Sequence, residues 1–298
     1  MKHWMRHVVL LLAIVLLSTI AVQGQAQPQP PVLPPPIVVP PPPLEPDRPD
    51  VTNGTHIVDV GLLQIEFGGL FSRASDRRNV GTPVTARIGL TDWIEARVGG
   101  DGWLVSSDQQ GRESGLGNVQ LGVKLRLWAD PGGIPVLSIL PMINLPTASE
   151  QKGLGSGQAD LTIAILTGTD VKTRGHVDFN YAFGMIGAGT GLDRFAQHLL
   201  SASASAEVPG PVTPYLEAFW LSRQEPQGTP VVAIDGGAIY VLNPRWAIDG
   251  GVQAGLSSAA PAFSAFGGLS VVVGNILGEH GVHARQRQAA RRGAPRGR

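Results

Sequence analysis

Polar and aliphatic side chains alternate without interruption in residues 118–127. Successive side chains of a strand point to opposite faces, so this period of two predicts a β-strand with one polar and one apolar face. After Thr52 the chain divides into about 12 such segments, each near the ~9–11 residues that a tilted membrane strand needs. The segments are residues 60–72, 84–90, 94–101, 118–127, 134–145, 160–169, 176–183, 201–207, 212–222, 230–242, 245–256 and 263–274.

The connections between these segments alternate in length. Short turns rich in Gly, Pro, Asn and Asp are expected at residues 91–92, 130–133, 209–211 and 243–244. Longer connections are expected at residues 73–81, 105–115, 146–159, 189–194 and 223–229. Short turns on one rim and long loops on the other are typical of outer-membrane barrels, with the short turns on the periplasmic side. The sequence therefore predicts an all-β fold, a transmembrane antiparallel β-barrel of up-and-down meander topology.

The charged side chains of the strands fix which face meets lipid. An Arg or Lys on the lipid face near the membrane midplane costs about 2–4 kcal/mol. We therefore expect every charged strand residue to face the lumen and to influence selectivity. These residues are Glu66, Arg87, Glu95, Arg97, Lys124, Arg126, Asp160, Asp178, Glu217, Asp235 and Asp249. The cations fall on three consecutive strands and most of the acids on later ones, which predicts a basic wall and an acidic wall.

Aromatic residues near the strand ends suit an interfacial girdle. Trp220, Tyr240 and Trp246 fit that position, whereas the alternation turns Trp93 and Trp128 inward.

The regions outside the strands indicate export. Residues 1–26 combine an early Lys2 and Arg6 with an apolar core, which predicts a cleaved signal peptide. The core is shorter than the roughly 20 residues of a spanning helix, which weighs against a membrane anchor. We expect residues 27–52 to form a Pro-rich periplasmic linker, residues 53–275 the barrel, and residues 276–298 a basic disordered tail.

Composition narrows the function classes. The chain has no Cys, which excludes disulfides and Cys-ligated metals, and its formal net charge of +0 gives no field for nucleic acid. One arrangement, His176 and Asp178 beside Ser201 and Ser203, superficially resembles a catalytic set, but no nucleophile elbow or spacing supports it. The His residues are scattered, so we expect no enzyme, no metal site and no cofactor.

A family resemblance joins these observations. The run Gly115-Leu116-Gly117-Asn118-Val119-Gln120-Leu121-Gly122, followed by Leu145-Pro146-Thr147 and by Leu154-Gly155-Ser156-Gly157 with Asp160, resembles the outer-membrane proteins grouped as the putative MetA-pathway of phenol degradation family. The chain departs from that pattern at Asn118, where Asp is usual, and at Ala148, where Gly is common. The resemblance implies an outer-membrane barrel that passes small, often aromatic or hydrophobic, molecules.

The leading hypothesis is therefore a passive channel for small solutes in a Gram-negative outer membrane. Its expected partners are outer-membrane lipid, a small-molecule solute and the barrel assembly machinery, with cell-wall contact through the linker or the tail. The last strand ends in Gly274-Asn275 and lacks the terminal aromatic residue that the assembly machinery reads in many barrels. Two alternatives remain: a secreted soluble all-β ligand-binding protein, and a closed structural barrel without transport.

Overall fold

The computed structural model describes residues 44–48, 51–128, 135–171 and 174–278. Backbone contacts divide the chain into residues 1–40 and 41–298, and every described residue belongs to the second unit. The predicted signal peptide, residues 27–43 of the predicted linker and the tail from residue 279 lie outside the described residues. Within the described ranges, no helix is long and apolar enough to cross a membrane.

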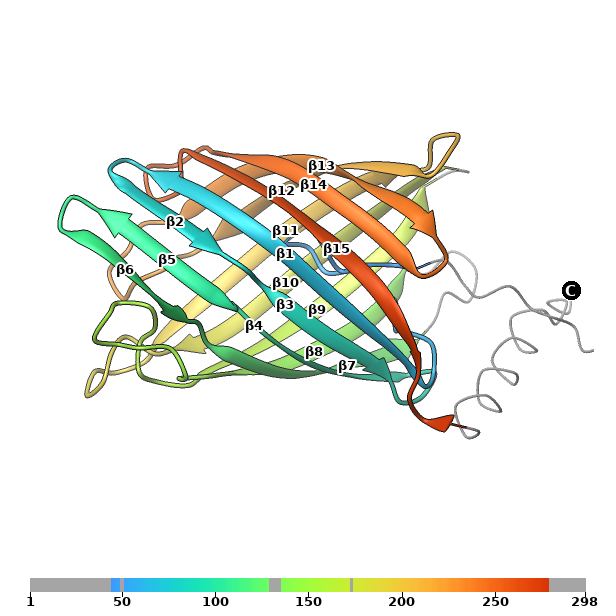
Figure 1. The fold of residues 1–298 in the computed structure, drawn as a ribbon, viewed down its shortest axis with the longest axis horizontal. Helices are drawn as coiled ribbons and strands as arrows, with labels where there is room; N and C mark the ends of the chain where they lie inside the picture. The colour runs from blue at the N-terminus through green and yellow to red at the C-terminus, as the bar shows by residue number, and fades with distance from the viewer. Residues whose placement is uncertain (1–43, 49–50, 129–134, 172–173, 279–298) are drawn as a thin grey trace, which may run out of the picture. The chain divides into compact units, whose positions relative to one another are not determined.

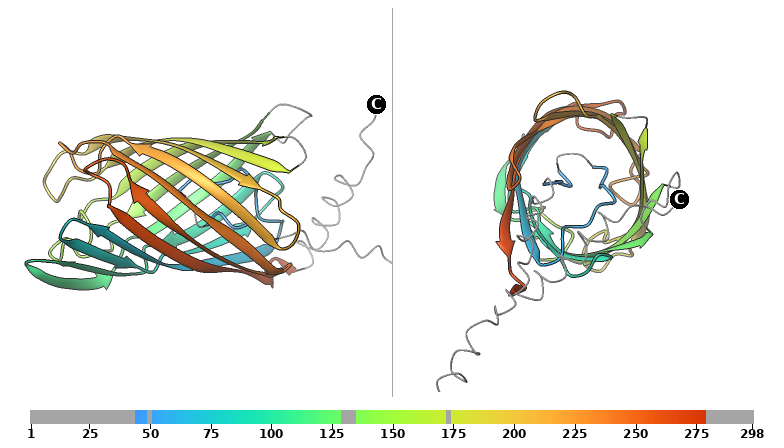
Figure 2. Two further views of the ribbon diagram at one scale, coloured as in Figure 1. Left: turned by 90° about the horizontal axis from the view of Figure 1, so that it is seen from above. Right: turned by 90° about the vertical axis from the view of Figure 1, so that its right-hand side faces the viewer.

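The wall is a closed antiparallel barrel of 12 strands, as the alternation predicts (Figures 1 and 2). Each strand pairs with its neighbour along the chain, and β15 closes the ring by pairing with β1. Nine wall strands are single segments: β1 (Leu62–Ala74), β8 (Val136–Leu145), β9 (Asp160–Val171), β10 (Gly175–Ile186), β11 (Phe195–Ala206), β12 (Val212–Leu221), β13 (Val231–Asn243), β14 (Trp246–Gly255) and β15 (Phe263–Asn275).

The other three wall strands are each broken into two segments. They are β2 (Arg77–Gly81) with β3 (Val84–Gly89), β4 (Ile94–Gly100) with β5 (Trp103–Asp108), and β6 (Gly111–Leu116) with β7 (Val119–Trp128). The breaks lie side by side, because Gly117 N donates to Gly102 O at 2.7 Å and Thr82 N donates to Trp103 O at 3.1 Å. Gly102 has φ of +63°, a backbone conformation that favours glycine.

Residues of the family-like motif hold the three neighbouring strand breaks in position through hydrogen bonds. Thr147 Oγ1 accepts a hydrogen bond from Val119 N at 2.9 Å and donates to Gly117 O at 3.1 Å. Asn118 Oδ1 accepts from Ala148 N at 3.0 Å, while Asn118 N donates to Asp101 Oδ2 at 3.2 Å. The motif residues therefore join the bent strands to the start of the connection that follows β8.

The two rims differ in the way that the sequence predicts, with one correction. The predicted long connections follow β8, β10 and β12, a further one that was not predicted follows β14, and the opposite rim carries the short turn between β13 and β14. The predicted turn at 130–133 lies outside the described residues. The expected loops at residues 73–81 and 105–115 are instead hairpins, β1–β2 and β5–β6, that extend the wall beyond the long-loop rim (Figure 1). Strands that project beyond the membrane meet water on both faces, so their sequences need not alternate.

The outer face of the wall is apolar and the inner face polar. Phe67, Val98, Phe179, Leu216 and Val252 are among the exposed large hydrophobic side chains of the strands. Charged side chains such as Arg87 and Lys124 are buried inside the ring. This distribution is that of a membrane barrel and contradicts a two-sheet sandwich, whose apolar faces pack on each other.

One aromatic prediction is wrong. Trp128, which the alternation turns inward, is exposed and lies opposite Leu137 in the register. The β7–β8 register shifts between Arg126 and Trp128, so the alternation is interrupted before Trp128. Trp93 lies in the turn before β4, where strand alternation no longer applies.

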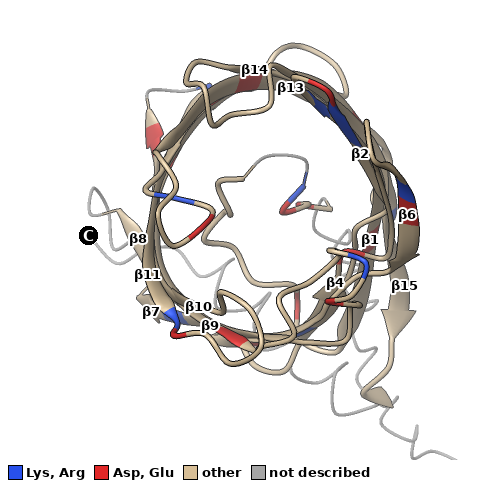
Figure 3. Ribbon diagram, turned by 90° about the vertical axis from the view of Figure 1, so that its left-hand side faces the viewer, with Lys and Arg blue, Asp and Glu red and all other residues tan. Residues whose placement is uncertain are grey.

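The N-terminal residues of the described chain lie within the barrel (Figure 2, right; Figure 3). We call residues 44–60, described apart from 49 and 50, the plug. The sequence assigns residues up to 52 to an extended linker and residues 53–60 to the barrel domain. The structure differs at both, since this segment carries no strand, apart from a single bridge at Val60, and binds the inner wall through polar contacts.

Candidate functional site in the barrel lumen

The basic wall is built from β3, β4 and β7, which are neighbours in the sheet. Arg87 on β3 lies directly opposite Arg97 on β4. Glu95 on β4 lies directly opposite Lys124 on β7. Like charges that face each other across two strands destabilise the pair, so the two arginines need carboxylates between them.

Glu95 supplies one of these carboxylates from the wall. Arg87 donates to both of its oxygens, from Nε and Nη2, at 3.0 Å each, and Arg97 Nη2 donates to Oε1 at 2.6 Å. Arg87 Nη1 also donates to Glu66 Oε1 at 2.7 Å. Because these groups are almost fully buried, the bidentate geometry and the additional hydrogen bonds are what offset the cost of removing charges from water.

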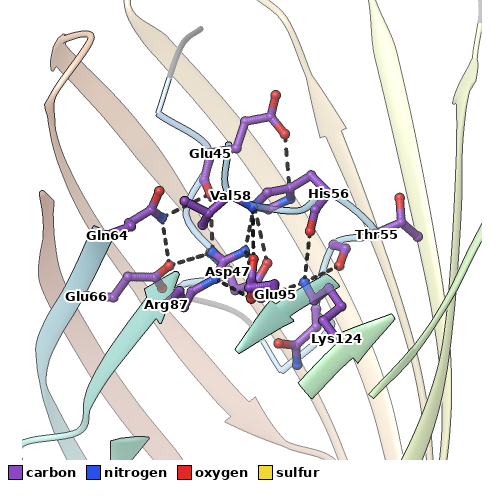
Figure 4. Close-up of polar contacts among 12 residues, drawn as sticks. Glu45, Asp47, Thr55, His56, Val58, Gln64, Glu66, Arg87, Glu95 and Lys124 are labelled. Carbon is purple, nitrogen blue, oxygen red and sulfur yellow. Dashed lines mark hydrogen bonds and ion pairs between the residues drawn. The ribbon is translucent and has the colours of Figure 1, made fainter. Parts of the chain in front are cut away.

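The plug supplies the second carboxylate through Asp47 (Figure 4). Asp47 Oδ2 accepts hydrogen bonds from Arg97 Nη2 at 2.6 Å and from Lys124 Nζ at 2.8 Å, and lies 3.5 Å from Arg87 Nη2. We call Arg87, Arg97 and Lys124 the cationic cluster. Lys124 Nζ also donates to Gly54 O at 2.7 Å, so the cluster binds plug backbone as well as the Asp47 side chain.

Glu217 on β12 forms a second anchor for the plug. Its carboxylate accepts hydrogen bonds from Val51 N at 2.8 Å and from Thr52 N at 2.6 Å. Thr52 Oγ1 also donates to Glu217 and lies 2.8 Å from Ser201 Oγ on β11. Two backbone N–H groups that would otherwise be buried without partners are satisfied by one charged acceptor.

Further contacts join the plug to the remaining parts of the ring. Arg48 Nη2 lies 3.4 Å from Asp249 Oδ1 on β14 and donates to Gly267 O on β15 at 3.2 Å. Ser138 Oγ on β8 donates to Thr55 O at 3.1 Å, and Val58 N donates to Glu95 at 2.9 Å. These contacts are polar, and the described chain has no cysteine to make any of them covalent.

A cavity of about 550 Å³ lies between the plug and the strands β9 to β13. Asp47, Thr52 and His56 line it from the plug. The wall contributes hydroxyl groups and apolar side chains, among them Ser203, Tyr215 and Ile239, together with the titratable side chains Asp170, Arg174, His176, Asp178 and Glu207. Its volume is within the range of small-molecule sites.

The structure brings most of the expected lumen residues into contact with the plug or with one another. Glu66, Arg87, Glu95, Arg97 and Lys124 form one network, and Glu217 lies opposite Asp235 in the strand register. Asp249 binds Arg48, Arg126 lines a second cavity beside Glu45 and His56, and Asp178 lines the 550 Å³ cavity. Asp160 stands apart, at the long-loop rim, where it accepts from Gly187 N at 2.8 Å.

The His176 arrangement is a salt bridge. Its Nδ1 lies 2.7 Å from Asp170 Oδ1 and its Nε2 lies 3.2 Å from Asp178 Oδ2. Both ring nitrogens therefore face carboxylates, and neither faces a serine hydroxyl. No group of three or more His, Cys, Asp or Glu in the described part of the chain has the geometry of a metal site.

Four plug residues that the sequence pattern does not predict complete the site: Asp47, Arg48, Thr52 and His56. They lie in or beside a Pro-rich stretch that has no alternation, so the strand pattern does not mark them. One signal was present: the run Glu45-Pro46-Asp47-Arg48 interrupts the Pro-rich stretch with three charged residues.

Solved structures share this fold. An outer membrane channel of Pseudomonas putida F1 aligns with a TM-score of 0.57 at 15% identity, covering 73% of this chain and 97% of that chain. The NanC porin aligns with a TM-score of 0.51 at 10% identity, covering 70% of this chain and 100% of that one. At such low identity the likeness shows the fold, which is that of outer-membrane barrels.

No curated protein matches the sequence significantly. The family model described as "Putative MetA-pathway of phenol degradation" matches residues 46–272, which span the plug and nearly all of the barrel. The chain belongs to this family.

Proposed function

We propose that the protein is an outer-membrane channel for the passive passage of small molecules, with aromatic or hydrophobic compounds as its substrate class. The observation that carries the proposal is the combination of a polar lumen with a plug that is held by noncovalent contacts alone. A segment of this kind can leave the lumen without unfolding the wall, because the described plug residues pair with the barrel ladder only at the end of the plug, through the bridge between Val60 and Gly89. The family description, which refers to phenol degradation, supports the aromatic substrate class.

The chain offers a direct test, because it contains no native cysteine. Thr52 Oγ1 and Ser201 Oγ are 2.8 Å apart, so Thr52→Cys with Ser201→Cys places two sulfur atoms together and allows a disulfide to lock the plug to β11. In planar bilayers and in liposome-swelling assays, we expect the oxidised double variant to be closed and the reduced one to conduct. The matched control is Ser201→Cys alone, whose conductance should be the same with and without the oxidant. A reduced protein without conductance or solute flux would contradict the channel proposal.

A closed structural barrel is the second candidate, and the dense contacts of the plug favour it. It predicts no flux in either redox state. The proposal further includes export through residues 1–26, insertion by the barrel assembly machinery, location in the outer membrane, no catalysis and a role for the lumen charges in selectivity. Contact with the cell wall through the linker or the tail belongs to the same proposal.

A further inference from the structure

Within the part of the chain that the structure describes, the cationic cluster has an excess of positive charge that is balanced by the plug alone. Its three cations meet two wall carboxylates, Glu66 and Glu95, and the third carboxylate is Asp47. If Asp47 withdraws, one buried positive charge is left without a partner. Such a charge is costly unless an anion or water replaces the lost carboxylate. The site therefore selects an anion whenever the plug leaves it.

Asp47 fills this site incompletely. Its Oδ2 takes the hydrogen bonds from Arg97 and Lys124, whereas Oδ1 is buried without a hydrogen bond, 3.5 Å from His56 Nε2. The plug backbone constrains where the Asp47 carboxylate can lie. A free carboxylate lacks this constraint and can present both oxygens to the forked donors of arginine.

The cavity beside Asp47 gives such a molecule a place to bind. The cavity of about 550 Å³ touches Asp47 at one end and extends across the lumen to Tyr215, Ile239 and Val241. Its lining includes Asp178 and Glu207 but none of the three cations of the cluster, so a bound organic acid would direct its carboxylate toward the Asp47 end and its apolar body toward the far wall. An inorganic anion has no apolar body to place there.

We propose that the cationic cluster is a binding site for the carboxylate group of small organic acids, and that Asp47 occupies it as a tethered substitute. A bound carboxylate replaces Asp47 on Arg97 and Lys124 and so loosens the plug. This inference rests on the proposed function and adds to it a substrate class and a means of opening. A group tethered near its site competes with an effective concentration on the order of millimolar, so free carboxylates should act in about that range.

A plug reporter tests the inference without any need for flux. Ile57 is a buried plug residue, so Ile57→Cys introduces one cysteine that a water-soluble maleimide reaches slowly while the plug is bound. We expect millimolar sodium benzoate to raise the labelling rate of the folded full-length protein several-fold. Benzamide, which is neutral, and sodium chloride at equal ionic strength should leave the rate unchanged. Equal effects of benzoate and benzamide, or of benzoate and chloride, would overturn the inference.

Matched variants locate the effect. In the Ile57→Cys background, Asp47→Asn and Arg97→Gln should each label fast from the outset and lose the response to benzoate. Asp249→Asn removes the wall partner of Arg48 at a different anchor, so it should raise the basal rate and keep the response. A benzoate response that survives in Arg97→Gln would contradict the assigned site. If any variant fails to fold, the comparison of benzoate with benzamide on Ile57→Cys still decides.

Different results would contradict the channel function and the carboxylate site. A protein that conducts when the plug is released, yet labels at the same rate with and without benzoate, retains the channel function and loses the carboxylate site. A protein whose labelling responds to benzoate but which never conducts retains the site and loses the channel function.

Discussion

Asp47 and Thr52 lie five residues apart in the plug and bind opposite sides of the barrel. Asp47 contacts Arg97 on β4, whereas Thr52 contacts Glu217 on β12. Six steps around the ring separate these strands in either direction. A chain of five residues spans at most about 18 Å, so the short segment between the two anchors limits how far either anchor can move independently. Loss of one anchor should therefore weaken the other.

The Glu217 anchor can be tested by removing its charge. Glu217→Gln weakens the charge-assisted hydrogen bonds from Val51 N and Thr52 N, each worth about 1.5–3 kcal/mol. We expect faster maleimide labelling of the Ile57→Cys reporter in this variant. Asp160→Asn is the control, because it removes a lumen acid that lies away from the plug, at the long-loop rim, where it accepts from Gly187 N. Equal labelling of the two variants would show that Glu217 does not hold the plug.

The inside and outside of the wall can be tested on one strand, β7. Val123→Arg places a cation on the lipid side and should lower the folding yield in detergent or lipid, at a cost of about 2–4 kcal/mol near the midplane. Gln120→Arg points into the lumen and should fold almost normally. Heat-modifiable migration in gels measures the folded fraction. Equal yields from the two variants would contradict the assignment of faces.

The basic wall should govern ion selectivity once the plug is released. Lys124→Met with Arg126→Met removes two lumen cations, and we expect the reversal potential in a salt gradient to shift toward cation preference. The same double variant should conduct more readily, because Lys124 no longer holds Asp47 and Gly54 O. An unchanged reversal potential would mean that these side chains only brace the plug.

A contact between two long loops should depend on pH. Glu150 accepts hydrogen bonds from Thr190 N and Thr190 Oγ1, at 2.6 Å each, and these bonds lower the pKa of its carboxyl group. A carboxyl group with a lowered pKa stabilises the contact above its ordinary pKa, near 4.3, and loses that contribution as the pH falls through the lowered value.

We therefore expect amide exchange at Thr190 to accelerate, relative to an unprotected reference amide, only at strongly acidic pH. Glu150→Gln should abolish this dependence. A relative exchange rate that changes near neutral pH would assign the transition to another group.

The alternation of polar and apolar residues predicts most of the strands, because a strand between lipid and a polar lumen needs one apolar and one polar face. In residues 118–127 and 176–183 one face meets lipid and the other the lumen, so alternation is required and the predicted strands are found in β7 and β10. The hairpin of β5 and β6 escaped prediction because no such requirement acts on strands that leave the membrane. Trp128 was misplaced because one register shift reverses the faces, and a single sequence does not mark where it occurs.

The site was predicted only in its wall half. Arg87, Arg97 and Lys124 follow from the cost of charge in lipid, but their partner Asp47 lies 40 residues or more away along the chain, in a stretch without periodicity. Pairing over such a separation leaves little local signal. The two indications are the excess of cations on consecutive strands and the charged residues that interrupt the Pro-rich stretch.

The long separation between the plug and its partners has a consequence for the order of assembly. Thr52 precedes Glu217 by 165 residues, and the walls that bear Arg97 and Glu217 are held in position only when β15 has joined β1. The plug is synthesised before every strand that it binds, yet its Asp47 and Thr52 anchors can be made together only when the wall between β4 and β12 is in place. We therefore expect the lumen of a newly closed barrel to hold water until both anchors have formed.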